Sequence, residues 1–239
     1  MAAELSNTQI DRLGDRLRRG AFSEDDVRLL NHYRRSFAGA YATVVRTIRA
    51  QLQLEPTGRS AKSTSSVIEK LRRESIRLTQ VQDVAGCRLV VDDILEQDRV
   101  VSALATLFPG AAIVDRRKNP SHGYRAVHII AHLSGKLVEI QVRSALQHLW
   151  AELSERLSDV FDASIKYGGG PAQHRQILDR ISQQLASAEA LEAGLATPWE
   201  RERPDREALA RLAAGTKQDL NSLLGEAISS LERMRSERK

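Results

Sequence analysis

The segment 138–143 alternates aliphatic and polar side chains, and its polar members are of types that take part in catalysis. If it forms a β-strand, one face carries Glu139, Gln141 and Arg143, while the aliphatic side chains occupy the other face. Three polar groups on a mostly buried sheet cost free energy unless something pairs with them. The segment is therefore either an exposed sheet face or a strand that faces a ligand.

A second carboxylate, Asp83, opens the segment 83–88 within a basic region. An acid in such surroundings suggests a metal ligand. On neighbouring strands, Asp83 and Glu139 would form the carboxylate pair that Mg²⁺ favours, with nucleotide oxygens and water completing its coordination shell. Strict alternation along a strand sends Asp83 and Arg88 to opposite faces, so we expect a kink at Gly86.

A row of potential phosphate ligands precedes this acid. Lys62, Ser66 and Lys70 are spaced i, i+4 and i+8, and Arg59 lies just before them. On a helix this spacing places all three along one side. Such a row could hold a triphosphate, with lysine as a point charge and serine as a hydrogen-bond donor. The same pattern also occurs on ordinary solvated helix faces.

An aromatic residue follows a second basic run. The cations at 116–118 and a breaker at 119–120 precede the segment 121–128, in which Tyr124 and His128 would share a strand face. An aromatic ring beside a glycine and a cluster of cations, among them Arg117 and Lys118, suits a stacked base with phosphates nearby. Alternatively, Tyr124 and His128 are half-buried residues of the core and bind no ligand.

Positive charge is concentrated in the two stretches that contain these motifs. Residues 59–88 carry seven Lys or Arg against three Asp or Glu, and residues 115–143 carry six against two. Each stretch is therefore +4, compared with +5 for the whole chain of 239 residues. Because the excess is local, a polyanion is expected to bind where the stretches meet, unless the charges are solvated surface groups.

The composition is typical of a globular protein, with 41% hydrophobic and 28% charged residues. No stretch approaches the roughly 18 apolar residues of a membrane span, and the N-terminal segment lacks the apolar core of a secretory signal. Cys87 is the only cysteine, which excludes an intrachain disulfide and a cysteine-rich zinc site. We therefore expect a cytoplasmic protein with no membrane partner.

Apolar periodicity predicts helices in the N-terminal third of the chain. A stripe with steps of three and four residues runs from Val27 to Leu52. The breaker at 55–58 interrupts it and a polar loop is expected to follow. A second helix is expected to start at about residues 63–65.

The character of the sequence changes after this helix. Residues 84–91 have the β-branched and apolar content of a buried strand, and residues 94–108 follow a helical pattern. Three short strand patterns come next, at 111–115, 124–132 and 136–143. This order predicts an α/β (α+β) fold, in which a mixed β-sheet is flanked by helices.

The C-terminal part is again helical in pattern, first from 144 to 157 and, after a linker at 166–171, at 172–195 and 204–235, with a break at Thr197-Pro198. The predicted organisation has three parts: an N-terminal helical region at 1–58, a catalytic core at 59–170 and a C-terminal helical extension at 171–239.

In this order and at these spacings, the motifs resemble the synthetase domain of RelA/SpoT proteins, especially the small, single-domain alarmone synthetases. The matching stretches are RSAKSTSSVIEKLRRES, DVAGCRLVV, NPSHGYRAVH and VEIQVRSALQHLWAELSERL. The resemblance implies a nucleotidyltransferase-like fold and a pyrophosphokinase that uses ATP and Mg²⁺.

The resemblance also implies roles for individual residues. Asp83 is similar to the family's Mg²⁺ ligand, and Glu139 to the acid that binds metal and activates the attacking 3′-hydroxyl. The residues expected to bind ATP are Arg59, Lys62, Ser66, Lys70 and Arg88. The residues expected to bind the acceptor are Tyr124, His128, Gln141, Arg143, Arg117 and Lys118.

Within these sets, Arg59 and Arg88 resemble the arginines that sandwich adenine, and Tyr124 resembles the tyrosine that stacks on the acceptor base. Family members often show Arg-x-Lys-Ser, whereas here two residues, Ser60 and Ala61, separate Arg59 from the lysine. The role of Arg59 therefore depends on a loop that absorbs the extra residue.

The implied reaction transfers a diphosphate. A carboxylate near Mg²⁺ draws the proton from a ribose 3′-hydroxyl, because that hydroxyl is a poor nucleophile. Its oxygen then attacks the β-phosphorus of ATP, and AMP leaves. Mg²⁺ and the lysine and arginine side chains stabilise the charge that develops on the phosphate oxygens.

Two acceptors are compatible with the resemblance. GDP or GTP would give the alarmones ppGpp and pppGpp, whereas a diphosphate on the 3′ end of tRNA would block aminoacylation and so inhibit translation. The second activity belongs to toxic family members that are paired with a protein antitoxin. The segment LQHLWAELSERL…IKYGGG is more similar to the toxic group, and clustered positive charge suits a tRNA acceptor stem. The sequence therefore favours tRNA.

An alternative hypothesis, of a different functional class, is that the chain is a non-catalytic nucleotide- or RNA-binding module. The presence of both Asp83 and Glu139 argues against it. The helices after Pro171 could serve as a surface for homo-oligomerisation or inhibitor docking, or could brace the catalytic core.

Overall fold

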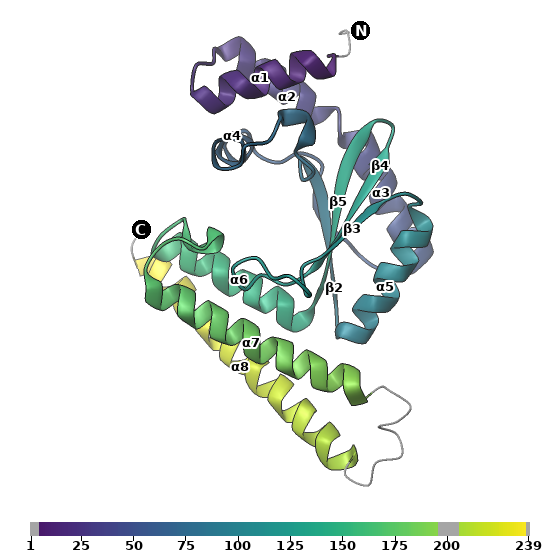
Figure 1. Ribbon diagram of the computed structural model, residues 1–239, viewed down its shortest axis with the longest axis vertical. Helices are drawn as coiled ribbons and strands as arrows, with labels where there is room; N and C mark the ends of the chain where they lie inside the picture. Colours follow the sequence, from purple (N-terminus) through teal and green to yellow (C-terminus); the bar gives the residue numbers. More distant parts are fainter. Residues whose placement is uncertain (1–4, 196–205, 238–239) are drawn as a thin grey trace. The chain divides into compact units, whose positions relative to one another are not determined.

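The computed structural model describes residues 5–195 and 206–237 (Figure 1). In chain order, the elements are α1 (Asn7–Arg19), α2 (Glu24–Arg35), α3 (Ala38–Leu52), β1 (Thr57–Arg59), α4 (Thr64–Arg73), the 3₁₀ helix η1 (Leu78–Gln80), β2 (Ala85–Val91), α5 (Ile94–Leu107), β3 (Ala112–Asp115), β4 (Val127–Leu133), β5 (Lys136–Ser144), α6 (Ala145–Val160), the 3₁₀ helix η2 (Ile165–Tyr167), α7 (Ala172–Leu195) and α8 (Arg206–Glu237).

Five strands form one mixed sheet in the order β1-β2-β5-β4-β3. β1 pairs with β2 in antiparallel register, with Thr57 opposite Arg88 and Arg59 opposite Gly86. A two-residue turn joins β4 to β5, and both of its residues, Ser134 and Gly135, have positive φ, as hairpin turns of this length require. The predicted α/β class, a mixed sheet flanked by helices, is confirmed.

The chain forms two compact units. The first unit contains residues up to Leu89 together with 103–113 and 128–141, and the second contains 90–102, 114–127 and 142 onward. The two units alternate along the chain, so each contains parts of the predicted catalytic core. The linear division into 1–58, 59–170 and 171–239 stays a prediction.

The N-terminal helices belong to the first unit. Ser6 and Gln9 form a capping box at the start of α1, and Gly20 ends the helix with a φ of +74°, where a side chain would be strained. The apolar face of α1, including Leu13 and Leu17, packs against α4 and η1. These caps fix both ends of α1, and its buried leucines hold the helix against α4 and η1.

The apolar stripe predicted between Val27 and Leu52 occupies two helices, α2 and α3. They are separated at Ser36, whose hydroxyl donates to the carbonyl of Tyr33 at 2.6 Å. The Tyr33 and Phe37 rings then meet edge to face at 5.2 Å. The stripe continues across the break because the two rings fill the gap between the helices.

The strands differ from the prediction at two points. β1 lies where a polar loop was expected, because Gly58 lets the backbone approach β2 closely: a Cβ there would lie 2.3 Å from the Gly86 carbonyl oxygen. β4 begins at Val127 rather than at Tyr124, since a tight turn occupies residues 121–124. The lengths of β2, α5 and β5 agree with the predicted segments within two residues.

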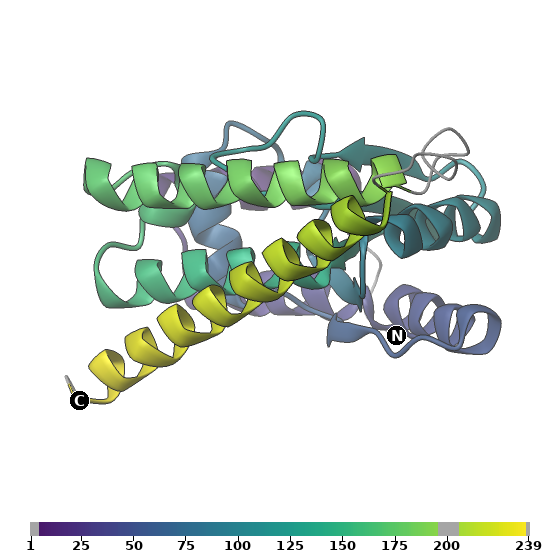
Figure 2. The ribbon, with the colours of Figure 1, turned by 90° about the horizontal axis from the view of Figure 1, so that it is seen from below.

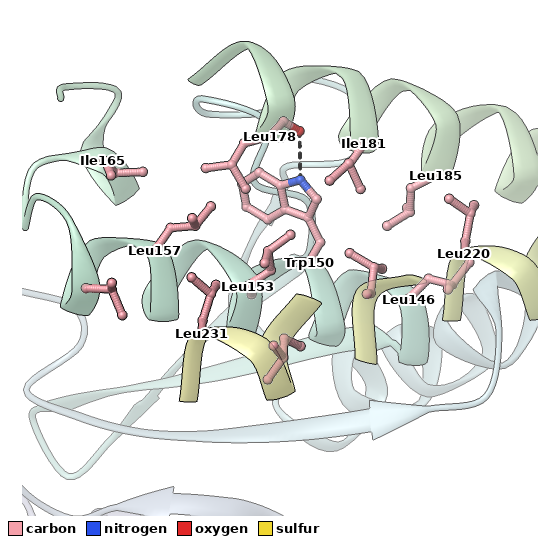
Figure 3. Packing of buried hydrophobic residues seen from close by; sticks show 14 of the residues in the cluster. Leu146, Trp150, Leu153, Leu157, Ile165, Leu178, Ile181, Leu185, Leu220 and Leu231 are labelled. Carbon is pink, nitrogen blue, oxygen red and sulfur yellow. Dashed lines mark hydrogen bonds between the residues drawn. The ribbon is translucent and has the colours of Figure 1, made fainter. Parts of the chain in front are cut away.

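The second unit is built around α6, α7 and α8, which pack on one another, with α8 crossing the other two obliquely (Figure 2). Figure 3 shows the leucine and isoleucine side chains that fill the space between them, with Trp150 of α6 at the centre. The Trp150 indole Nε1 donates to the Leu178 carbonyl of α7 at 2.9 Å. This bond satisfies the one polar group of a buried ring.

The predicted helix at 172–195 is confirmed as α7, and the structure describes α8 from Arg206 onward. The predicted break at Thr197-Pro198 and the predicted helix start at Pro204 lie outside the described residues. In the described parts of the chain, none of the helices combines the length and the apolar character needed to cross a bilayer.

Candidate active site

Asp83 lies in the turn that precedes β2, and two lysines hold its carboxylate. The Lys62 Nζ lies 2.6 Å from Oδ2, and the Lys70 Nζ lies 2.8 Å from Oδ1. The Asp83 side chain is 21% exposed. Two ammonium groups meet one carboxylate here, and the Lys70 Nζ also lies 3.9 Å from Oε2 of Glu74.

Opposing effects act on the pKa of Asp83. Burial raises this pKa because it disfavours the charged form, but the charges of Lys70 and Lys62 and the hydrogen bonds that they donate outweigh burial and lower the pKa to about 2. The carboxylate is therefore ionised at neutral pH and is available as an anionic oxygen ligand.

The predicted row of phosphate ligands is wrong in one respect. Lys62 precedes α4 instead of lying on it, because Ser63 is the N-cap residue and accepts a hydrogen bond from the backbone N–H of Ser66. The Ser63 hydroxyl also donates to the Ser66 hydroxyl at 2.7 Å. Lys62 and Lys70 nevertheless converge on Asp83, so the two cations lie together although only one is helical.

The kink expected at Gly86 is also wrong. Asp83 lies outside β2, so strand alternation does not set its direction. β2 keeps a regular register with β1 through Gly86, and residues Ala85 to Leu89 alternate between buried and partly exposed. A turn, and not a bend in the strand, directs the carboxylate of Asp83.

The predicted alternation along β5 holds from Val138 to Val142 and ends at Arg143, which is buried. Val138, Ile140 and Val142 are fully buried on one face, while Glu139 and Gln141 are partly exposed on the other. The His128 Nδ1 lies 2.8 Å from Glu139 Oε1, and the Gln141 Nε2 donates to Glu139 Oε2 at 2.7 Å. Both carboxylate oxygens of Glu139 are therefore held in place by side chains of the same sheet face.

The pKa of Glu139 is lowered. Burial acts to raise it, and the nearby charge of Asp83 acts in the same direction, but the hydrogen bonds and the charge supplied by His128, with the bond from Gln141, outweigh both. The charge of Asp83 thus opposes the lowering of the pKa of Glu139 but does not cancel it. Gly86 makes room for Glu139, because a Cβ at that position would lie 3.0 Å from the Glu139 carbonyl oxygen.

Arg59 and Arg88 share a face of the β1–β2 ladder. Thr57 is opposite Arg88 and Arg59 is opposite Gly86, so the two arginines are diagonal neighbours, a separation that long side chains can bridge. Arg59 is exposed and Arg88 is partly buried. The pairing places two guanidinium groups on the sheet face that carries Glu139, because Gly86 contacts Glu139 on that side.

The loop that contains the extra residue is held at both ends. The Lys62 backbone N–H donates to the Val84 carbonyl at 2.6 Å, and the Arg34 guanidinium of α2 donates to the Lys62 carbonyl. The same guanidinium donates to Thr64 Oγ1 at 2.7 Å. The loop therefore absorbs the insertion before Lys62, and an N-terminal helix contributes to its position.

The acceptor-binding candidates of the second unit centre on Tyr124. This residue closes the turn 121–124 instead of starting a strand, which corrects the prediction that it shares a strand face with His128. The two central residues, His122 and Gly123, have φ of +52° and +81°, as in a type I′ turn. The turn, and not strand alternation, sets the direction of the tyrosine ring.

Arg143 at the end of β5 holds the Tyr124 ring. Its guanidinium carbon lies 5.1 Å from the ring centroid, and its NH2 group donates to the tyrosine hydroxyl at 3.1 Å. The ring also lies 6.4 Å from the Trp150 ring, with the two planes tilted. Tyr124 is therefore partly buried against the helical core of the second unit, with its hydroxyl end fixed by a cation.

Arg117 and Lys118 differ in exposure and in their contacts with the protein. The Arg117 guanidinium donates to Asp115 at 2.9 and 3.0 Å, to Asp98 at 2.7 Å and to Gln97 at 3.2 Å. Lys118 is exposed. The protein itself thus satisfies most of the donors of Arg117, which favours a structural role for this arginine, and the acceptor role of both residues stays a prediction.

The donor set of the first unit fits Mg²⁺. Among residues 5–195 and 206–237, no group of three or more His, Cys, Asp or Glu side chains is arranged to hold a metal ion. Asp83 and Glu139 supply two interacting carboxylates, the hard oxygen donors that Mg²⁺ takes when substrate phosphates and water complete its coordination. A metal held by these two acids would thus depend on a bound nucleotide.

Several polar residues of the second unit were missed by the sequence reasoning. Glu189 of α7 is buried and accepts hydrogen bonds from Ser144 at 2.9 Å and from Gln147 at 2.5 Å. Burial raises the pKa of Glu189 in spite of these bonds and of the charges of Arg125 and Arg117. One signal was available: Glu189 falls on the apolar stripe of α7, where a charged residue is out of place.

Part of the chain is similar in sequence to known proteins. Residues 58–159 match the family model described as the region found in RelA/SpoT proteins. An uncharacterised protein of Mycobacterium tuberculosis is 43% identical over 118 residues, which are 47% of this chain and 43% of that relative. GTP pyrophosphokinase YjbM of Bacillus subtilis is 32% identical over 146 residues, covering 53% of this chain and 64% of the relative. The chain thus spans less than half the length of the mycobacterial relative.

A solved structure shows the same fold. The small alarmone synthetase 1 of Bacillus subtilis, bound to its product pppGpp, superposes with a TM-score of 0.52 at 23% identity, covering 72% of this chain and 97% of that chain. The matched region 58–159 contains Asp83, Glu139 and Tyr124 with their hydrogen-bond partners Lys62, Lys70, His128, Gln141 and Arg143.

Proposed function

We propose, from the RelA/SpoT region at residues 58–159, that this chain transfers the β,γ-diphosphate of ATP to the 3′-hydroxyl of a ribose. One observation carries the proposal. Glu139 is a partly buried carboxylate that two neighbours hold in place, and it lies within the electrostatic influence of a second carboxylate, Asp83, to which two lysines are bonded.

The lysines suit the donor. Lys62 and Lys70 both pair with Asp83, and ammonium groups of this kind can bind the oxygens of a polyphosphate. A metal ion held by Asp83 and Glu139 would supply electrostatic stabilisation of the phosphate oxygens. With Asp83 engaged in that way, its lysines are free to form charge-assisted hydrogen bonds to the donor phosphates.

Glu139 suits the role of general base. Its lowered pKa keeps it ionised at neutral pH, so it can take the proton of the 3′-hydroxyl as the new bond forms. The 3′-oxygen then bonds to the β-phosphorus, the bond between that phosphorus and the α,β-bridging oxygen breaks, and AMP leaves with both electrons of the broken bond. His128, bonded to Glu139, orients the carboxylate.

Arg59 and Arg88 suit the adenine of ATP. They are diagonal neighbours on the sheet face that carries Glu139, and the flat face of a guanidinium group stacks well on an aromatic base. Tyr124, with its hydroxyl held by Arg143, offers a ring on which the acceptor base can stack.

We favour GDP or GTP as the acceptor. The GTP pyrophosphokinase of Bacillus subtilis is 32% identical to this chain over 146 residues. The cations that favoured a tRNA acceptor are partly engaged inside the second unit: Arg117 by Asp98 and Asp115, and Arg125 by Glu189. They therefore contribute less to an open basic surface than the sequence alone indicated.

The 3′ end of tRNA is the second candidate. Its support is the exposure of Arg116 and Lys118 in the segment before the Tyr124 turn, because exposed cations contribute to binding of nucleic acid phosphates. A protein antitoxin would be expected with this acceptor, since uncontrolled tRNA modification would stop translation. Homo-oligomerisation through the C-terminal helices stays a prediction in either case.

The acceptor can be identified directly. The full chain is incubated with Mg²⁺ and γ-labelled ATP, with GDP, GTP or deacylated tRNA offered in turn, and Glu139→Gln serves as the control. We expect label on GDP or GTP from the wild-type protein alone. Label on tRNA alone would establish the second candidate, and no transfer to any acceptor would reject the diphosphotransferase proposal in favour of a binding module.

A further inference from the structure

The buried stripe of α7 contains two polar residues. Its apolar members, Leu178, Ile181, Leu185 and Ala188, pack into the helical core of the second unit. Ser182 and Glu189 lie on the same stripe and are 5% and 3% exposed. A buried polar group is costly unless it is hydrogen-bonded, so the partners of these two side chains indicate what α7 holds in place.

Ser182 holds the turn that carries Tyr124. Its hydroxyl donates to the Gly123 carbonyl at 2.7 Å. Gly123 is also packed tightly against the helices, because a Cβ there would lie 2.8 Å from Cζ2 of Trp150 and 3.3 Å from Cβ of Ser182. With a φ of +81°, this position favours glycine on conformational grounds as well. The turn therefore sits directly on α6 and α7.

Glu189 reaches the residue that follows the tyrosine. Its Oε1 accepts from Ser144 and Gln147 at the start of α6, and its Oε2 lies 3.5 Å from the Nε of Arg125. Within the described residues, neither Oε2 nor this Nε has a hydrogen-bond partner. Each group therefore depends on the charge of the other to offset its burial.

The contacts with α7 thus flank Tyr124 in the sequence. Ser182 bonds to the residue before it and Glu189 pairs with the residue after it, while Arg143 fixes its hydroxyl. α7 lies outside the matched region 58–159, so a segment beyond the RelA/SpoT region supports the ring proposed to stack on the acceptor.

We infer that α7 sets the affinity for the acceptor, with Ser182 and Glu189 acting as positioning residues for Tyr124 through Gly123 and Arg125. The inference rests on the proposed function, in which Tyr124 binds the acceptor base. Neither residue touches the carboxylates or the lysines of the donor side in the contacts described above, so their loss acts on acceptor binding and leaves ATP binding unchanged.

Two conservative substitutions test this role. Ser182→Ala removes only the hydroxyl bonded to Gly123. Glu189→Gln keeps an oxygen that can accept from Ser144 and Gln147 but removes the charge facing Arg125. The matched controls lie on the same helix: Ser187→Ala removes a bond to the helix's own Gln183 carbonyl, and Glu192→Gln removes the ion pair with Lys217.

The measurement is steady-state kinetics on the full chain with Mg²⁺ and ATP, with GDP, GTP or deacylated tRNA as the acceptor. We expect each test variant to raise KM for the acceptor about tenfold, the loss of one hydrogen bond or contact pair. KM for ATP and kcat at saturating acceptor should stay at wild-type values at a temperature well below Tm, and both controls should behave as wild type. Equal changes in the two KM values, or none, would overturn the inference.

Hydrogen exchange separates this inference from the proposed function, because it needs no activity. The backbone amides of residues 121–125 should exchange about tenfold faster in Ser182→Ala and in Glu189→Gln than in the two controls, since the turn loses its support. Unchanged exchange in both test variants would overturn the positioning role even in an active enzyme. Faster exchange in a chain that transfers diphosphate to no acceptor would support the positioning of Tyr124 and reject only its proposed use.

Discussion

Asp83 is a partly buried carboxylate and Glu189 a buried one, and both have cations nearby, yet their pKa values move in opposite directions. Burial acts to raise the pKa of both. Asp83 bonds directly to two ammonium groups at 2.6 and 2.8 Å, and its pKa falls to about 2. Glu189 bonds to neutral donors and only approaches a guanidinium at 3.5 Å, and its pKa rises.

The difference shows what each region is suited to do. Direct contact with two cations keeps Asp83 charged, as a metal- or phosphate-binding site requires. Neutral donors hold the position of Glu189 without stabilising its charge to the same extent, which suits a residue that joins α7 to α6. The first region is thus arranged for charge, and the second for position.

The largest expected effect is the loss of catalysis in the first region. Glu139→Gln should lower kcat about a thousandfold, the usual contribution of a general base, because the amide cannot take the proton of the 3′-hydroxyl. Single-turnover transfer of labelled diphosphate measures the change, and circular dichroism checks the fold. A rate within a few fold of wild type would remove Glu139 from the mechanism and weaken the contrast with Glu189.

Tyr124 should show an intermediate effect that separates binding from chemistry. Tyr124→Ala should raise KM for the acceptor by about tenfold to a hundredfold, the range for one base–aromatic stack. Tyr124→Phe keeps the ring and loses the hydroxyl bond to Arg143, so its effect should be smaller. Initial rates over a series of acceptor concentrations give both values, and equal effects of the two variants would contradict stacking.

The contrast between the two carboxylates predicts opposite dependences of stability on pH. The folded pKa of Asp83 lies below its ordinary value of 3.8, so its ion pairs stabilise the fold above that value. This contribution, about 2 kcal/mol, is lost as the pH falls from about 4 to about 2. The folded pKa of Glu189 is raised, so its contribution is present at low pH and is lost as the pH rises through the folded pKa.

Denaturant unfolding as a function of pH measures the contributions of Asp83 and Glu189 to stability. In Asp83→Asn the free energy of unfolding should fall less steeply as the pH decreases from about 4 to about 2. In Glu189→Gln it should fall less steeply as the pH rises through the pKa of Glu189. Each variant removes one titrating group. If Asp83→Asn left the acid limb unchanged, the ion pairs with Lys62 and Lys70 would not stabilise the fold.

The smallest expected effect is at Cys87, which shows burial without a cation. Burial, with a contribution from the charge of Glu139, raises the pKa of its thiol to about 12. We therefore expect a thiol reagent at neutral pH to react with the folded chain far more slowly than with the unfolded chain. Rapid labelling of the native protein would show that β2 opens easily and would question the rigidity of the strand next to Glu139.

Sequence patterns predicted most of the elements that carry the site. The alternation in 138–143 predicted β5 and its polar face, and the serine at the start of α4 predicted that helix. Both predictions rest on local physics, since strand alternation and helix capping involve residues that are close in the chain.

Predictions that assumed a regular element failed where a turn was present. The sequence pattern places Tyr124 and Asp83 each on a strand, but in the structure turns set their directions. The sequence contained a hint at Tyr124, because His122-Gly123 can adopt the two positive φ angles of a hairpin-type turn. At Asp83 no comparable local signal was present.

The types and spacing of residues by themselves determined the fold class, the two carboxylates and the cations around them. Only the tertiary structure decided which charges meet: that two lysines share Asp83, that Arg117 is engaged by acids, and that Glu189 of α7 faces Arg125. The physical reason is that local propensities act over a few residues, whereas a pKa and an ion pair depend on groups brought together from distant parts of the chain.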